Sequence, residues 1–90
     1  MIESRTVVET ASGPRLIRRL CKHWAHRLEI DADQGRVVFD GGVCHMRATE
    51  ERLEVRLEAS DAERLARLQG VVASHLERLA GKERLSIVWP

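Results

Sequence analysis

The sequence predicts an α+β fold in which two helices cover one face of an antiparallel-rich sheet of five to six strands. Two segments repeat apolar residues every three or four positions, which is the spacing of a helix with one buried stripe. Elsewhere apolar and polar residues alternate, as they do in half-buried strands. The predicted order is strand, helix, four strands, helix and strand (β-α-β-β-β-β-α-β), which makes a two-layer sandwich.

The first helix is predicted over residues 14–27. Its apolar stripe consists of Leu16, Ile17, Leu20, Cys21, Trp24 and Leu28. Pro14 suits the first turn of a helix, where the N–H that proline lacks would have no partner, and Ser12 or Gly13 can serve as the N-cap. The stripe indicates that this helix packs against the sheet.

The second helix is predicted over residues 61–80. Its apolar stripe consists of Leu65, Leu68, Val72, Leu76 and Leu79. Ser60 and Glu63 have the spacing of a capping box, in which each side chain accepts a hydrogen bond from the backbone of the other residue. Gly81 follows Ala80 and can adopt the left-handed conformation that ends many helices. Both ends of this helix are therefore marked in the sequence.

Alternation of apolar and polar residues predicts the strands, most clearly over residues 52–59. The other strands are predicted over residues 5–9, 28–30, 36–39, 43–48 and 85–89. Asp40, Gly41 and Gly42 predict a hairpin turn, because glycine accepts the positive φ that tight turns demand. The alternation also predicts a polar sheet face on the side away from the helices. That face is expected to display Arg52, Glu54, Arg56, Glu58, His45 and Arg47.

Size, charge and hydropathy exclude several classes of protein. Ninety residues allow one domain, which spans residues 1–90. The net charge is only +1, and the two Trp and one Phe fall on inward positions, so we expect no nucleic-acid binding. No apolar run approaches the roughly 20 residues of a membrane-spanning helix. Residues 1–10 lack the pattern of a secretory signal, so we expect a cytoplasmic protein that does not bind membranes.

Three stretches of the sequence resemble a known family. They are residues 20–26 (LCKHWAH), 35–39 (GRVVF) and 71–78 (VVASHLER). Together they are similar to the bacterial family designated domain of unknown function 2218, and the resemblance extends from the first strand to Trp89. It implies a small, soluble protein. Some members of that family resemble a tail appended to siderophore-interacting, flavin-dependent ferric reductases, so the resemblance also implies a link to iron metabolism.

No motif of an enzyme or cofactor site is present. The nucleophile elbow Gly-x-Ser-x-Gly and the glycine-rich phosphate and dinucleotide loops are absent, so we expect a non-enzymatic protein without a cofactor. Cys21 and Cys44 lack the spacing of a zinc or redox motif and fall on inward positions, which predicts buried free thiols. A reactive Cys21 thiol beside Lys22 is the alternative.

Four histidines raise the question of a metal site. His23 and His26, three residues apart on one helix, form the only local chelate, and a tetrahedral site needs two more ligands. His45 is expected on the open side of the sheet, away from this pair. His75 flanks the stripe of the second helix, where we expect a hydrogen bond to hold it at the core margin. We therefore expect no metal site, with a metal-binding module using His23 and His26 as the alternative.

The first predicted helix carries the only polarised charge pattern in the chain. No acidic residue occurs between Pro14 and Leu28. The basic residues of this segment are Arg15, Arg18, Arg19, Lys22 and Arg27. This pattern predicts one exposed, basic helix face.

A binding site is predicted at the exposed edge of this helix. Arg19, Lys22, His23 and His26 occupy neighbouring positions there and offer hydrogen-bond donors to carboxylate or phosphate. We predict a small binding or accessory domain whose partner is an acidic protein or a small anionic ligand. The family resemblance implies an iron-uptake reductase or its ferric-siderophore ligand as that partner. The alternatives are a solvated helix with cations paired to nearby carboxylates, and a structural domain that self-associates, as a homodimer, through its open sheet.

Overall fold

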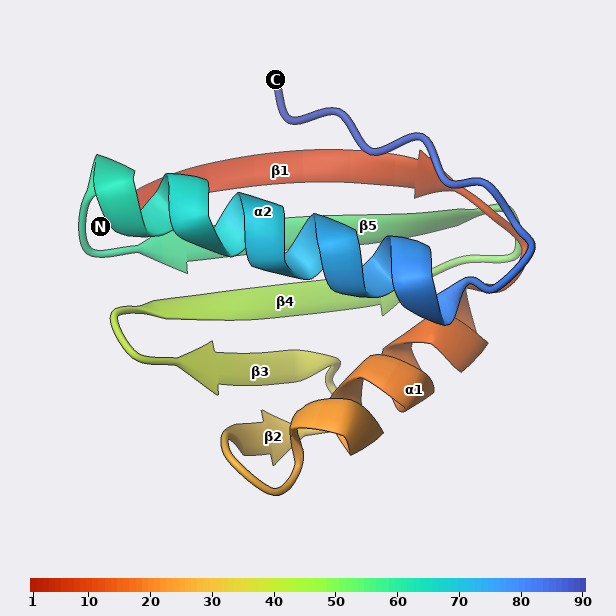
Figure 1. Cartoon of the computed structure of the whole chain (residues 1–90), viewed down its shortest axis with the longest axis horizontal. Helices are drawn as coiled ribbons and strands as arrows, with labels where there is room; N and C mark the ends of the chain where they lie inside the picture. Colours follow the sequence, from red (N-terminus) through yellow and green to blue (C-terminus); the bar gives the residue numbers. More distant parts are fainter.

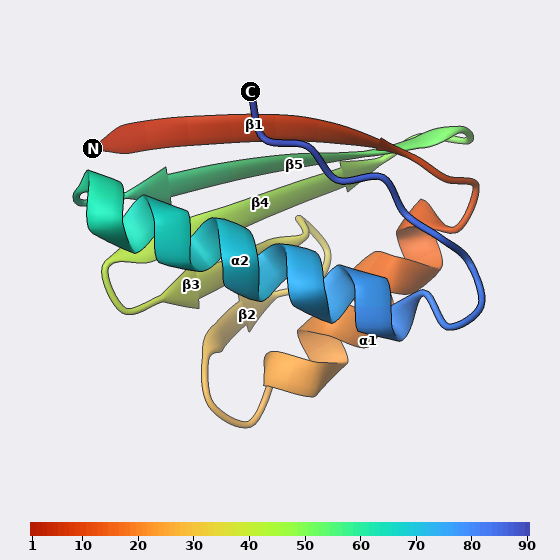
Figure 2. The same cartoon turned by 45° about the horizontal axis from the view of Figure 1, so that its top comes forward.

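The computed structural model describes residues 1–90 and contains a five-stranded antiparallel sheet with two helices on one face (Figures 1 and 2). In chain order the elements are β1 (Ile2–Glu9), α1 (Gly13–Trp24), β2 (Glu29–Asp31), β3 (Arg36–Phe39), β4 (Gly42–Ala48), β5 (Arg52–Ala59) and α2 (Ala62–Leu79). The strands lie in the order β1-β5-β4-β3-β2. The predicted α+β sandwich is confirmed.

The sheet is a four-strand meander, β2 to β5, to which β1 adds beside β5. The predicted hairpin turn lies between β3 and β4, where Gly41 has a φ of 78°. Gly42 lies against the Leu68 side chain of α2 and the Glu58 carbonyl, so a Cβ at this position has no room. The two glycines therefore serve different needs, a left-handed turn and a close approach between sheet and helix.

The core lies between the helices and the inner face of the sheet. The alternation in β5 buries Leu53, Val55 and Leu57, and the open face carries the charged residues between them, as predicted. From the helices, the buried apolar side chains are Leu16, Leu20, Cys21, Trp24, Leu68, Val72 and Leu76. Neither helix combines the length and the apolar composition needed to span a bilayer.

The inner face of β1 is partly polar, which the sequence did not lead us to expect. Ser4 and Thr6 are buried on that face. The Gln69 side chain of α2 donates to Ser4 Oγ at 2.9 Å, and Thr6 Oγ1 donates to the Val88 carbonyl at 2.6 Å. Because both hydroxyls have partners, burying them does not carry the penalty of an unsatisfied polar group.

The strand predicted over residues 85–89 does not form. Leu85, Ile87 and Trp89 pack against the core, so the alternation does report an extended, half-buried segment. The segment lies beside β1 (Figure 1), but no backbone hydrogen bond joins the two. Its links to the N-terminal part of the chain include the Thr6 bond to Val88 and a bond from Thr10 Oγ1 to Glu83 Oε2 at 2.6 Å. Alternation of apolar and polar residues predicts that one side of a segment is buried. It does not predict that the backbone of the segment pairs with a neighbouring strand.

The ends of the helices also differ from the prediction. α1 ends at Trp24, whose carbonyl accepts hydrogen bonds from the N–H groups of both Arg27 and Leu28, so residues 25–27 form a tight turn into β2. The capping box does not form at α2. Asp61 is the N-cap there, and its carboxylate accepts from the Arg64 N–H at 2.8 Å. That bond lowers the pKa of the Asp61 carboxyl, since it favours the charged form.

Truncation of a core leucine tests this packing. Leu20 and Leu76 are fully buried. Leu20→Ala or Leu76→Ala should each lower the free energy of unfolding by about 2 to 5 kcal/mol, because each leaves a cavity that the core cannot fill. Urea unfolding of the variants measures this loss. Val7→Ala, on the exposed face of β1, is the control and should change stability by less than about 0.5 kcal/mol. A loss below about 1 kcal/mol at either leucine contradicts the described core.

Candidate functional site

The predicted basic face of α1 is present and exposed. The apolar stripe of the helix is buried against the sheet and α2, so the opposite side faces solvent. The exposed side chains on α1, apart from Pro14 in its first turn, are Arg15, Arg18, Arg19, Lys22 and His23. Arg27 and His26 are also exposed, in the turn that follows the helix. We call the cations Arg15, Arg18, Arg19, Lys22 and Arg27 the α1 cations.

The α1 cations have no carboxylate partners. Seven ion pairs occur in the structure, and none includes an α1 cation. The pairing to nearby carboxylates that the solvated-helix alternative requires is therefore absent. Arg15 instead donates to the Ser12 hydroxyl at 3.0 Å, within its own helix end. Lys22 has no hydrogen-bond partner, and its ammonium group is free to meet an anion.

Arg19 connects the two helices. Its guanidinium donates to the Leu79 carbonyl at 2.9 Å, at the C-terminal end of α2. The last carbonyl groups of a helix lack partners within the helix, and a basic side chain favours the negative end of the helix dipole. Of the four predicted site residues, Arg19 therefore has a structural role in addition to its exposed position.

His23 lies beside His75 of α2. The two ring centres are 5.0 Å apart, and the planes are tilted by 55°. Trp24 neighbours both rings, with its centre 6.1 Å from that of His23 and 4.9 Å from that of His75. Trp24 also contacts Phe39 of β3 edge to face, with ring centres 5.0 Å apart. We call His23, Trp24, Phe39 and His75 the aromatic cluster.

The orientation of His75 is fixed by the backbone. Its Nδ1 lies 2.7 Å from the Val71 carbonyl, which can only accept a hydrogen bond. Nδ1 therefore carries the hydrogen, and the lone pair of the neutral ring is on Nε2. The predicted hydrogen bond at the core margin is confirmed.

The neighbour of His23 differs from the one that helical spacing indicated. His26 lies in the exposed turn after α1 and makes no ring contact, while His75, from the other end of the sequence, does. No group of three or more His, Cys, Asp or Glu side chains in the structure could hold a metal ion. The pattern of α2 placed His75 at the core margin, but the residue of α1 that it meets depends on how the two helices cross.

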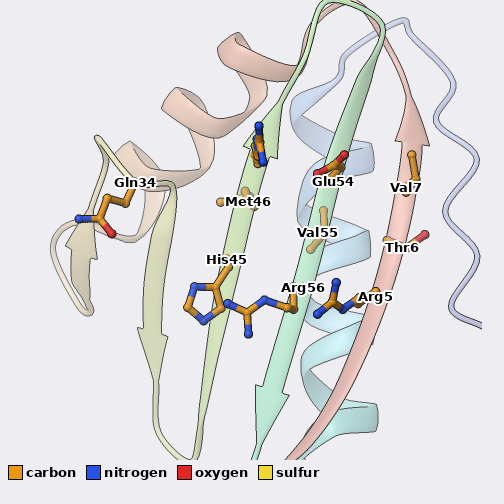
Figure 3. Close-up of a pocket in the computed structure, with 10 residues that line it drawn as sticks. Arg5, Thr6, Val7, Gln34, His45, Met46, Glu54, Val55 and Arg56 are labelled. Carbon is orange, nitrogen blue, oxygen red and sulfur yellow. The ribbon is translucent and has the colours of Figure 1, made fainter.

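A shallow groove of about 450 Å³ lies on the open sheet face (Figure 3). The strand register places Arg5, Arg56, His45 and Arg36 side by side across four strands. Of these four residues, Arg5 and Arg56 are like charges directly opposite one another, which destabilises a sheet. The first three of these residues line the groove, and Figure 3 shows them in a line across β1, β5 and β4.

Carboxylates of the next row offset this repulsion. Glu3 Oε1 lies 2.7 Å from Arg5 Nε, and Glu58 pairs with both Arg56 and His45. The bond from Arg5, supported by the charge of Arg56, lowers the pKa of the Glu3 carboxyl. The cations of this row thus have partners within the sheet, unlike the α1 cations.

Both cysteines are buried free thiols, as predicted. Cys21 is 3% exposed and Cys44 is fully buried. Burial raises the pKa of the Cys44 thiol to about 12, with a smaller contribution from Cys21. Burial also raises the pKa of Cys21, and the charge of Asp31 adds to the effect. The alternative prediction of a reactive Cys21 thiol is therefore wrong, because burial disfavours the thiolate more than the nearby Lys22 favours it.

Alkylation of the thiols tests this result. At pH 9.0, the ordinary pKa of a thiol, burial covers both cysteines of the native protein and keeps a larger share of each thiol protonated than in the unfolded chain. Iodoacetamide should therefore label neither residue on the timescale on which it labels the urea-unfolded chain, because the thiolate is the nucleophile. Mass spectrometry counts the adducts. Labelling of Cys21 at equal rates in the native and unfolded chains contradicts the buried position.

The comparisons with known proteins agree with this fold. The chain is similar to the NMR structure of PA4090 from Pseudomonas aeruginosa, with 35% sequence identity over 100% of this chain and 96% of that chain and a TM-score of 0.84. No curated protein matches the sequence. A family model described as an uncharacterized protein conserved in bacteria matches residues 5–90. The chain therefore belongs to this bacterial family, domain of unknown function 2218.

Proposed function

We propose that this chain is a small non-enzymatic binding or accessory domain that contacts an acidic protein or a small anionic ligand through the exposed face of α1. The observation that carries the proposal is the absence of carboxylate partners around the α1 cations. Guanidinium and ammonium groups form charge-assisted hydrogen bonds to carboxylate and phosphate oxygens. An anionic partner would supply the charged acceptors that the protein itself does not.

The structure of α1 supports a binding role. Leu16, Leu20 and Trp24 anchor the helix in the core, and Arg19 joins it to α2. A rigid helix loses little conformational freedom when a partner binds, which favours affinity. Arg18 and Lys22 are one helical turn apart, and both are exposed side chains without a partner. His26 is exposed as well, so all three can be reached by a ligand at this face.

The family suggests where to look for such a partner. The resemblance to tails of siderophore-interacting ferric reductases makes an iron-uptake reductase or its ferric-siderophore ligand the proposed partner. An anionic ferric chelate would present carboxylate or phenolate oxygens to the α1 cations. A cytoplasmic location and a role in iron metabolism are parts of the same proposal.

Charge reversal on α1 tests the proposed function. A hexaglutamate peptide and citrate serve as probes of the acidic protein and the small anion, followed by backbone NMR shifts. In wild type, the largest shifts should fall on residues 15–27, and raising NaCl from about 20 mM to about 300 mM should weaken them. Arg18→Glu with Lys22→Glu should weaken binding by at least roughly fivefold, because two attractive contacts become repulsive.

A matched control changes the same number of charges on the open sheet. Arg47 and Arg52 are exposed there and have no ion-pair partner, so Arg47→Glu with Arg52→Glu should leave binding within about twofold. Shifts centred on β4 and β5, and lost in this control, contradict the α1 site. Sedimentation equilibrium tests the remaining alternative, a structural domain that forms a homodimer through its open sheet. A dimer that Arg56→Glu dissociates favours self-association through the open sheet.

A further inference from the structure

We infer that His23 and His75 form a two-nitrogen site for a first-row transition-metal ion whose other ligands come from outside the protein. The two side chains lie on different helices, 52 positions apart in the sequence, and their ring centres are 5.0 Å apart. The pairing replaces the chelate of His23 and His26 that helical spacing suggested. This inference deepens the proposed function. Its preference for an anionic metal complex rests on the proposed function, and the histidine pair itself does not.

The distance between the rings fits a shared ion. Two imidazoles that each hold a metal through one nitrogen at about 2.0 to 2.1 Å have ring centres roughly 4.5 to 5 Å apart when the bond angle at the metal lies between the octahedral and the tetrahedral value. The 55° tilt between the planes also separates this pair from a parallel ring stack. His23 is exposed, so the pair is open to solvent from the α1 side.

His75 is prepared for such a role by its other nitrogen. Metal-binding histidines almost always donate their second ring N–H to a carboxylate or a backbone carbonyl, which fixes the tautomer and turns the lone pair toward the ion. His75 has this arrangement, because Nδ1 donates to the Val71 carbonyl at 2.7 Å. Trp24 packs against the ring at 4.9 Å and limits its rotation. The lone pair on Nε2 has no hydrogen-bond partner within the protein.

The surroundings define the kind of metal species. Imidazole ligands suit zinc, copper, iron and nickel. With only two protein ligands, an ion must fill its remaining positions from elsewhere, and no third His, Cys, Asp or Glu is placed to help. Arg19 and Lys22 beside the pair oppose a bare dication and favour an ion held in an anionic chelate. Two protein ligands hold an ion weakly, so this site would bind a metal complex reversibly and is not a resident metal centre.

The nickel complex of nitrilotriacetate is a suitable probe. It has a net negative charge and leaves two adjacent coordination positions open, which two imidazoles can fill. Calorimetric titration of the untagged full chain should show one complex bound per chain. His23→Ala and His75→Ala should each weaken binding at least about tenfold, because each removes one of two ligands. His26→Ala and His45→Ala are the matched controls and should stay within about twofold of wild type.

The outcomes separate this site from its alternatives. His23→Gln, at an exposed position, gives a test that does not depend on whether His75→Ala folds, and urea unfolding checks both variants. Loss of binding in His26→Ala but not in His75→Ala overturns the proposal in favour of the local chelate. Absence of saturable binding in wild type also overturns it. Titration with hydrated Ni²⁺, which should bind more weakly than the anionic complex, separates the histidine site from the proposed anion-binding face. The histidine site predicts that Ni²⁺ binding is lost in His75→Ala. This result would stand even if Arg18→Glu with Lys22→Glu had no effect on the binding of the acidic probes, which would contradict only the proposed function.

Discussion

The packing of Trp24 determines the arrangement on which the rest of the structure depends. The indole is 6% exposed and lies where α1, α2 and β3 meet. Phe39 contacts it from the sheet and His75 from the second helix, so one side chain sets the spacing of three elements. Such aromatic contacts add about 0.5 to 1.5 kcal/mol beyond the burial of apolar area. The same contacts bring His23 and His75 together at the surface.

Charges are arranged differently on the two faces of the protein. Across the open sheet, the row of Arg5, Arg56, His45 and Arg36 is offset by carboxylates, as in Glu3 with Arg5. On α1, the basic side chains have no such partners. Arg47 and Arg52 of the open sheet also lack ion pairs, but the α1 cations are five in one segment that contains no acidic residue. Paired charges are typical of a solvated surface, whereas a group of unpaired donors on a rigid helix offers free binding capacity. This difference is the physical basis of the proposed binding face, which membership of the bacterial family alone does not identify.

The features that depend on local pattern were predictable from the sequence, and those that depend on packing between distant segments were not. Alternation over residues 52–59 was sufficient to predict which side of the sheet is buried. It could not distinguish a paired strand from the extended segment 85–89, since both bury alternate side chains. Likewise, helical spacing placed Arg19, Lys22 and His23 on one exposed face, while the contact of His23 with His75 required the crossing of two helices.

The most direct test is an NMR experiment that correlates the ring nitrogens of His75 with its ring protons at a pH where the ring is neutral. This experiment shows which ring nitrogen carries the hydrogen. The structure predicts a hydrogen on Nδ1, because the Val71 carbonyl accepts from it. It also predicts nuclear Overhauser effects from the His75 ring to the rings of His23 and Trp24. A hydrogen on Nε2, together with no contact between the two histidine rings, would contradict the described geometry and the site built upon it.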